Sequence, residues 1–170
     1  MTKAVREVTV GSANERPAEP ALSVAGYSVR PEVTAALMAE TGLDDARLTA
    51  LVHRFYDKIR RDPVLGPIFA ERIKDWDAHL ERMVSFWSSV ALMTGRYSGT
   101  PMQAHARLPV EWPHFERWLA LFSETAAETC PPEGASFVIE RARRIAQSLH
   151  MAVEDARGEG LRIRPPQNRK

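Results

Sequence analysis

The sequence predicts an all-α domain in which several helices of unequal length pack together. Apolar residues recur every three or four positions through most of residues 44–155, which is the spacing of one helix face. No segment shows the regular alternation of apolar and polar residues that marks a half-buried strand. Prolines and glycines interrupt the periodic segments and indicate where helices end. Because the segments differ in length, the pattern does not predict an up-and-down bundle of equal helices.

Three signals mark the first two helices. Pro31 fits the first turn of a short helix over residues 31–41, because a missing N–H costs nothing there. Gly42 follows that helix and is expected to end it. Asp44 or Asp45 then supplies an N-cap for the next helix.

The second helix carries the first strong apolar stripe. It must stop just before Pro63, since the residue before a proline avoids the helical conformation. In residues 64–69 (VLGPIF), Gly66 and Pro67 predict a turn, and Phe69 is expected to point inward. The stripe consists of Leu48, Leu51, Val52, Phe55, Tyr56 and Ile59.

A long central helix is predicted from about Lys74 to Thr94, with Gly95 as its terminator. On a helical wheel its apolar residues fall within an arc of about 120°. His79 lies in the middle of that arc. An imidazole buried there loses its hydrogen bonds to water, which costs free energy unless a partner binds its nitrogens. The arc consists of Trp76, His79, Met83, Phe86, Trp87 and Val90.

A second histidine lies in a short segment with defined ends. Residues 100–103 (Thr-Pro-Met-Gln) predict a capping box with proline at the first helical position. Pro109 ends this helix after barely two turns, so the orientation of His105 is set by both helix ends. His79 and His105 are therefore candidates for the two sides of one site.

Two further helices complete the prediction. Pro113 opens the first, and the Cys-Pro-Pro sequence at residues 130–132 breaks it. The second runs from about residue 133 to residue 155. Among the remaining candidates, His53 and His150 are expected to be exposed, His114 to lie in the first turn of its helix, and Trp76, Trp87 and Trp112 to be packing residues.

Composition limits the possible functions. The 170 residues, 44% of them hydrophobic, suffice for one domain, expected at residues 31–157 between flexible tails at 1–30 and 158–170. With 23 basic and 22 acidic residues, the chain has no overall field for nucleic acid or anionic membranes. The lone Cys130 excludes an internal disulfide and a cysteine-based zinc cluster. No apolar run suggests a membrane span or signal peptide, so a cytoplasmic location is expected.

A series of short motifs carries a family resemblance. The motifs are Phe55-Tyr56, DPVLGPIF at 62–69, Trp76-x-x-His79, Phe86-Trp87, Tyr97-x-Gly-x-Pro101, His105 with Leu108-Pro109, and Phe115-x-x-Trp118. Together, in this order and spacing, they resemble the group III truncated haemoglobins over about residues 44–155. The glycine-glycine motifs of the other truncated groups do not occur in the sequence.

The resemblance implies a truncated-globin fold, a two-over-two helical sandwich around haem b. It makes His105 the proximal iron ligand. It assigns Tyr56, His79 and Trp118 to the opposite, distal side, where the ligand binds. Further cofactor contacts are expected from Phe55, Phe69, Arg82, Met83, Phe86 and Tyr97.

Each of these residues also has an ordinary structural interpretation. Without the family pattern, His105 fits a surface loop and Trp118 fits the core. The Tyr56 hydroxyl could donate to a backbone carbonyl instead of to a ligand on the iron. Arg82 could reach a haem propionate or remain solvated. His79 could donate a hydrogen bond, serve peroxide chemistry as an acid or base, gate the pocket, or bind iron itself.

The leading function is reversible binding of a diatomic ligand, dioxygen or nitric oxide, at a histidine-ligated haem iron. If the protein is an enzyme, nitric oxide dioxygenation or a peroxidase reaction is expected. Either needs an external electron donor, because the sequence has no flavin or nicotinamide motif. The alternatives are a haem-based sensor or ligand-relay module and a haem-free helical interaction domain. A monomer or weak homodimer is expected.

Overall fold

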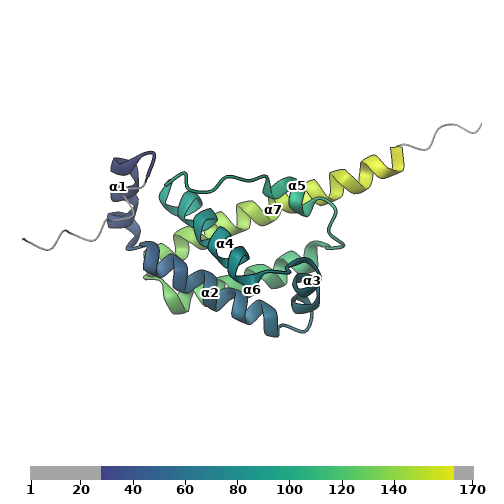
Figure 1. The fold of residues 1–170 in the computed structure, drawn as a ribbon, viewed down its shortest axis with the longest axis horizontal. Helices are drawn as coiled ribbons and strands as arrows, with labels where there is room; N and C mark the ends of the chain where they lie inside the picture. Colours follow the sequence, from purple (N-terminus) through teal and green to yellow (C-terminus); the bar gives the residue numbers. More distant parts are fainter. Residues whose placement is uncertain (1–27, 163–170) are drawn as a thin grey trace, which may run out of the picture.

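The computed structural model describes residues 28–162, and over this range its regular secondary structure consists of helices joined by loops, without strands (Figure 1). The all-α prediction is therefore confirmed. The expected tails lie largely outside the described residues. None of the helices between residues 28 and 162 has the length and hydropathy needed to cross a bilayer. The helices are α1 (Pro31–Thr41), α2 (Asp45–Arg61), α3 (Leu65–Arg72), α4 (Trp76–Leu92), α5 (Pro101–His105), α6 (Trp112–Thr129) and α7 (Pro132–Arg162).

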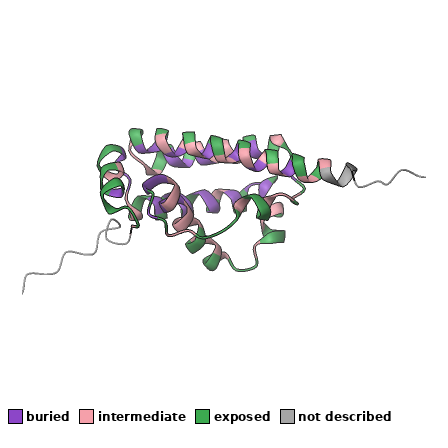
Figure 2. Cartoon of the chain, turned by 90° about the horizontal axis from the view of Figure 1, so that it is seen from above, coloured by how far each residue is buried: buried purple, intermediate pink, exposed green. Residues whose placement is uncertain are grey.

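Four long helices form the body of the domain. Helix α2 packs against α4 and α6, and α6 packs along α7, while the short helices α3 and α5 lie against α2 and α7 respectively (Figure 1). In Figure 2, α7 turns its buried residues toward the other helices and its exposed residues outward. The core is built on three large, fully buried side chains, Trp87, Phe55 and Phe122.

Aspartates start the two long helices α2 and α4. The Asp44 carboxylate accepts a hydrogen bond from the Arg47 backbone N–H at 2.7 Å, and the Asp75 carboxylate accepts one from the Ala78 N–H at 3.0 Å. Helix α4 ends two residues earlier than predicted, because the chain already turns at Met93, which adopts the left-handed conformation (φ 55°). The expected terminator, Gly95, adopts that conformation as well (φ 70°).

The turn predicted for residues 64–69 is wrong, because most of this segment lies in helix α3. Pro67 lies in the first turn, where no backbone N–H is needed. The Asp62 carboxylate accepts hydrogen bonds from the first two N–H groups of this region, at 3.0 and 2.9 Å. Glycine at position 66 permits close approach to α2, since a Cβ there would lie 3.0 Å from the Arg60 carbonyl oxygen.

Helices α5 and α7 also differ from their predictions. Thr100 is the N-cap of α5 but makes no side-chain capping bond, so the predicted capping box is wrong. Its carbonyl instead accepts from the Ala104 N–H at 3.2 Å. Helix α7 continues beyond residue 155 to Arg162, because isolated glycines weaken a helix by only about 1 kcal/mol each. The Arg157 guanidinium donates to the Val110 carbonyl at 2.9 Å and ties this part of α7 to the loop between α5 and α6.

Helix α1 is fixed to the end of α4. The buried Thr34 hydroxyl donates to the Leu92 carbonyl at 2.7 Å, which satisfies one of the open carbonyls at that helix end. The Val29 N–H donates to the Thr94 carbonyl at 3.1 Å. The segment before α2 is thus part of the packed domain from at least residue 28 onward.

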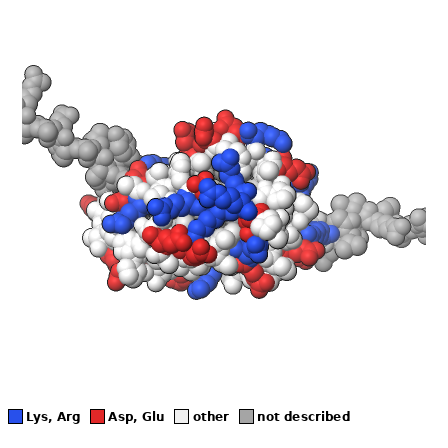
Figure 3. Space-filling model, turned by 90° about the horizontal axis from the view of Figure 1, so that it is seen from below, with Lys and Arg blue, Asp and Glu red and all other residues white. Residues whose placement is uncertain are grey.

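Charges of both signs share the face shown in Figure 3, where a central group of basic side chains lies beside acidic ones. Ion pairs between side chains of opposite charge also join helices α2 and α6. The Lys58 ammonium lies 2.6 Å from the Glu124 carboxylate and 2.8 Å from that of Glu128. Exposed ion pairs of this kind contribute only about 0–1 kcal/mol, so the apolar core contributes most of the contact between these helices.

Candidate functional site

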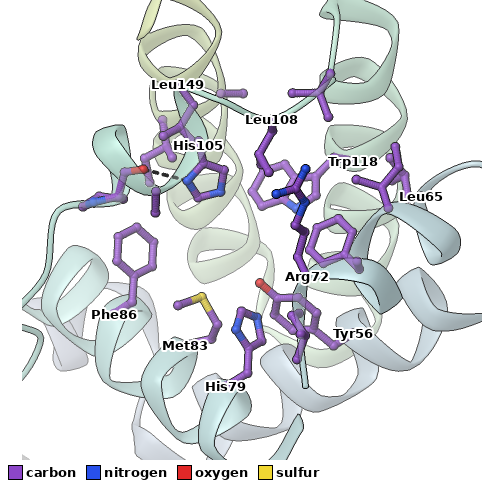
Figure 4. Close-up of a pocket in the computed structure, with 18 of the residues that line it drawn as sticks. Tyr56, Leu65, Arg72, His79, Met83, Phe86, His105, Leu108, Trp118 and Leu149 are labelled. Atoms are coloured by element: carbon purple, nitrogen blue, oxygen red, sulfur yellow. Dashed lines mark hydrogen bonds between the residues drawn. The ribbon is translucent and has the colours of Figure 1, made fainter. Parts of the chain in front are cut away.

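A largely apolar cavity of about 350 Å³ lies between α2, α3 and α4 on one side and α5, α6 and α7 on the other. Its volume falls in the range of roughly 300–1,000 Å³ that is typical of small-molecule sites. Figure 4 shows side chains from both groups of helices converging on it. All but one of the site residues proposed from the sequence line this cavity: Tyr56, Phe69, His79, Arg82, Met83, Phe86, Tyr97, His105 and Trp118.

His105 presents one ring nitrogen to the cavity. Its Nδ1 lies 2.7 Å from the Pro101 carbonyl oxygen, one helical turn earlier in α5 (Figure 4). A carbonyl only accepts hydrogen bonds, so the neutral ring must carry its proton on Nδ1. The lone pair is therefore on Nε2, and the ring cannot turn without losing the bond to Pro101. A histidine held in this way is prepared to coordinate a metal.

His79 and Tyr56 face His105 from across the cavity (Figure 4). Their ring centroids are 4.9 Å apart and their planes are nearly perpendicular. The His79 Nε2 is buried and has no hydrogen-bond partner among the described residues. Burial lowers the pKa of His79, and the positive charge of Arg82 lowers it further, which favours the neutral ring. A buried nitrogen without a partner indicates that a ligand belongs beside it.

The Tyr56 side chain is 6% exposed, and its hydroxyl points into the cavity (Figure 4). Burial raises the pKa of the phenol well above its usual value, so the hydroxyl keeps its proton at all ordinary pH values. Figure 4 marks no hydrogen bond from this hydroxyl to the side chains around it. The group is thus a hydrogen-bond donor directed at the space between His79 and His105.

Trp118 is held by stacking. Its ring is nearly parallel to that of Phe122, with centroids 5.3 Å apart, and Phe55 meets it edge-on at 5.3 Å. Phe55 itself is fully buried and does not line the cavity, contrary to the prediction of a cofactor contact. Its ring packs edge-on against those of Tyr56 and Trp118, with centroids 5.1 and 5.3 Å away, and so supports two side chains that do line the cavity.

Proteins of known family are similar to this chain in sequence and in fold. A family model of bacterial-like globins matches residues 37–156. The group 3 truncated haemoglobin ctb of Campylobacter jejuni is 34% identical over 110 residues, which cover 61% of this chain and 86% of that protein. The crystal structure of a group III truncated haemoglobin from Campylobacter jejuni matches with a TM-score of 0.62 and 31% identity, covering 65% of this chain and 91% of that one.

The chain belongs to the group III truncated haemoglobins. It is accordingly a haem-binding, ligand-binding globin with the truncated-globin fold predicted from the sequence. This family excludes the alternative of a haem-free helical interaction domain. The matched region begins within α1, somewhat earlier than the residue 44 expected from the motifs.

The cavity of this globin suits a haem on three grounds from its own residues. One wall offers a fixed imidazole with a free nitrogen at His105. The opposite wall offers a buried nitrogen without a partner at His79. At the rim, the guanidinium groups of Arg72 and Arg82 provide positive charge for carboxylates, while most of the remaining lining is apolar.

The sequence did not reveal several residues that line the globin's cavity. Arg72 was missed because the prediction placed a turn at residues 64–69 and began the next helix only at about Lys74, so that Arg72 fell between them. His114 was placed correctly in the first turn of its helix, but its proximity to the cavity depends on the loop before α6. The lining residues that were not predicted include Leu65, Ile68, Arg72, Ile73, Trp87, Leu108, Val110, His114, Phe115, Ile145, Ala146 and Leu149.

Two other histidines test the predictions of exposure. His53 is exposed on α2, as predicted. His150 is not fully exposed: its ring packs 5.3 Å from that of Trp112 and 5.7 Å from that of Phe115, and its Nδ1 is buried. The prediction failed because α7 is covered at this point by the start of α6, a contact that the helical wheel of α7 alone does not indicate.

Proposed function

We propose that this globin holds haem b in its cavity with His105 as the proximal ligand and binds a diatomic ligand on the opposite face. One observation carries this proposal. The Nδ1 of His105 is engaged by the Pro101 carbonyl at 2.7 Å, which leaves Nε2 as a free base on the cavity side. Haem supplies an iron that binds a diatomic ligand and exchanges single electrons.

The distal residues act as a hydrogen-bonding set for the ligand. Tyr56 donates its hydroxyl proton as a hydrogen bond, and its raised pKa keeps that proton in place. His79, which the lowered pKa favours as a neutral ring, can donate from one nitrogen and accept at the other. The indole N–H of Trp118 can only donate. Ligands that carry partial negative charge are favoured by such a set.

Redox detoxification of nitric oxide or peroxide is the reaction that this distal set serves. Peroxide chemistry needs a group that takes and returns a proton, and the ring of His79 lines the cavity 4.9 Å from that of Tyr56. Either reaction must be completed by electrons from an external donor, because the chain carries no motif for a flavin or a nicotinamide.

Replacement of His105 by alanine tests the proximal assignment. We expect the purified variant to lose most of its haem and the resonance Raman band of the iron–histidine bond, since it lacks the imidazole that the Pro101 carbonyl holds toward the cavity. In a His105→Gly variant, added imidazole should restore both. His53→Ala, which removes an exposed histidine from α2, is the matched control and should keep the parental spectrum.

Three outcomes would contradict this proposal. Haem content and an iron–histidine band that survive in His105→Ala would exclude His105 as the ligand. Loss of the band in His79→Ala instead would assign the iron to the other side of the cavity. A parental protein that takes up no haem at all would exclude the function as a whole.

A further inference from the structure

Three aromatic rings lead outward from the distal side of the cavity. Tyr56 and His79 line the cavity, and Trp76 does not. The Trp76 ring centroid lies 6.2 Å from that of Tyr56 and 6.0 Å from that of His79, in edge-to-face contacts. The rings therefore form a continuous aromatic contact that begins at the cavity and ends on Trp76.

Trp76 reaches the surface of the molecule. It is the first residue of α4 and is only partly buried. The guanidinium of the exposed Arg60 lies over its ring, 4.9 Å from the centroid. A tryptophan that touches Tyr56 and His79 and also meets solvent is in a position to exchange electrons between the cavity and a molecule outside it.

We infer that Trp76 is the electron-transfer relay through which an external one-electron donor reduces the haem site. The inference rests on the proposed function, since it takes haem to be the group in the cavity. In this relay, an electron passes from the Trp76 indole toward the cavity across the contact with Tyr56 and His79. The oxidised indole then takes one electron from the donor and returns to its original state.

The overall peroxide reaction balances with two such transfers. Hydrogen peroxide is the oxidant, its O–O bond breaks, and it accepts two electrons and two protons to give two molecules of water. The two electrons arrive singly through Trp76 from two donor molecules, each of which is oxidised by one electron. The two protons come from solvent. Trp76 itself is unchanged after each turnover.

Tyr56 is a less suitable terminus than Trp76. Oxidation of a phenol requires release of its proton, and the buried Tyr56 hydroxyl has a raised pKa and no marked acceptor among its neighbours. An indole can lose an electron while it keeps its N–H proton. The positive charge of Arg60 over the ring disfavours the oxidised indole, so the ring is readily reduced again by an anionic donor.

The second aromatic series at the cavity runs through phenylalanine rings, which are much harder to oxidise than an indole. Trp118 stacks on Phe122, and Phe122 stacks on Trp87 with centroids 4.6 Å apart. Phe122 and Trp87 are 0% and 2% exposed, and from Trp87 the series continues through Phe86 to the partly buried Tyr97, both of which line the cavity. Trp76, by contrast, is a partly exposed indole that contacts Tyr56 and His79 directly, with no phenylalanine between them.

Oxidation of ferrocyanide by hydrogen peroxide, catalysed by the haem-loaded protein, tests the relay. We expect Trp76→Phe to lower the rate roughly tenfold, which corresponds to about 1.4 kcal/mol in the barrier. Trp76→Tyr should retain part of the rate because a phenol is also oxidisable. Trp112→Phe, at a tryptophan that packs against Phe115 and His150, is the control and should keep the parental rate.

A second measurement does not depend on turnover. When peroxide is added without a donor, electron paramagnetic resonance of the parent should show a tryptophanyl radical that is absent in Trp76→Phe. Peptide mass spectrometry should then find added oxygen on Trp76, and ferrocyanide should protect it. Equal rates in parent and Trp76→Phe, or oxidation confined to other residues, would overturn the relay while haem binding and His105 ligation remain. Failure of the parent to take up haem would instead remove the proposed function.

Discussion

His105 and His114 both line the cavity, and one backbone partner decides what each of them can do. His105 donates from Nδ1 to the Pro101 carbonyl and so offers a bare Nε2. His114 does the opposite, because its Nδ1 accepts from the Glu111 N–H at 3.0 Å. Its neutral ring therefore carries the proton on Nε2, which can donate but cannot bind a metal. Local backbone geometry thus favours His105 as the ligand.

A change of one oxygen atom tests the role of Tyr56. In Tyr56→Phe, the ring packing against His79 and Phe69 is kept, and only the cavity-facing hydroxyl is lost. A hydrogen bond to a partly charged ligand is worth about 1–3 kcal/mol, so dioxygen release should accelerate about ten- to a hundredfold. Stopped-flow measurement of dioxygen dissociation from the ferrous protein gives this rate directly.

Tyr97 provides the comparison for that experiment. It also lines the cavity, but its ring packs against that of Phe86, with centroids 5.1 Å apart. Figure 4 shows Phe86 separated from Tyr56 by Met83 and His79. Tyr97→Phe should therefore change the dissociation rate much less than Tyr56→Phe. If the two variants release dioxygen equally fast, the hydroxyl of Tyr56 has no particular role toward the ligand.

At the scale of residues, the sequence predicts best where one helical stripe determines direction. Tyr56, His79, Met83 and Phe86 follow from the spacing within their own helices, and all of them line the cavity. The exclusion of Phe55 does not follow from that spacing, because a stripe contains both core and site positions. Which positions belong to the cavity is decided by the helices that cover the stripe.

At the scale of elements, Asp62 joins three helices. It follows the last residue of α2, its carboxylate accepts from two N–H groups at the start of α3, and the Arg117 guanidinium of α6 donates to it at 2.8 and 2.7 Å. The Asp62 side chain is almost fully buried, whereas Arg117 is partly exposed. One carboxylate therefore fixes the angle at which α3 and Phe69 approach the cavity.

Replacement of Asp62 by alanine should lower the free energy of unfolding by about 1–3 kcal/mol, since buried N–H groups lose their acceptor. The Arg117 hydrogen bond, with the two backbone N–H groups, holds the pKa of Asp62 at about 2, below its ordinary 3.8. The folded state thus binds this proton less readily than the unfolded state. The stabilisation is complete above about pH 4 and is lost as the pH falls toward 2.

Urea unfolding at several pH values separates the two effects. The difference between the parent and Asp62→Ala should be constant near neutral pH and should shrink as the pH falls from about 4 to about 2. Glu124→Ala, which removes one exposed partner of Lys58, is a suitable control and should cost under about 1 kcal/mol. A difference that does not depend on pH would show that the carboxylate charge is unimportant.

The elements that the sequence predicts well are those with both a stripe and a cap. Helix α2 starts after Asp44 and ends before Asp62 because a side-chain cap and a proline fix both ends. Helix α3 was missed because its Gly and Pro, which usually indicate a turn, here serve close packing and a first helical turn. Their role is set by contact with α2, which the local sequence does not contain.

At the scale of the whole molecule, the core and the cavity share one aromatic stack. Trp118 lines the cavity, Phe122 lies behind it with a nearly parallel ring, and Trp87 continues the stack while also lining the cavity. The stack joins α6 to α4 across the centre of the domain. Packing that stabilises the fold therefore also holds one of the distal residues in place.

Phe122→Ala should consequently change stability and ligand binding together. Removal of a fully buried phenylalanine costs about 3–5 kcal/mol, because the surrounding side chains fill the resulting space only in part. Trp118 loses its stacking partner, so its indole N–H is held less firmly and the rate of dioxygen release should rise. Urea unfolding and stopped-flow kinetics on the haem-loaded protein measure the two effects.

Phe137→Ala, at a partly buried ring of α7 that stacks with Arg141, should cost less stability and leave the release rate unchanged. If Phe122→Ala destabilises the protein and yet releases dioxygen at the parental rate, core packing and the distal site are independent.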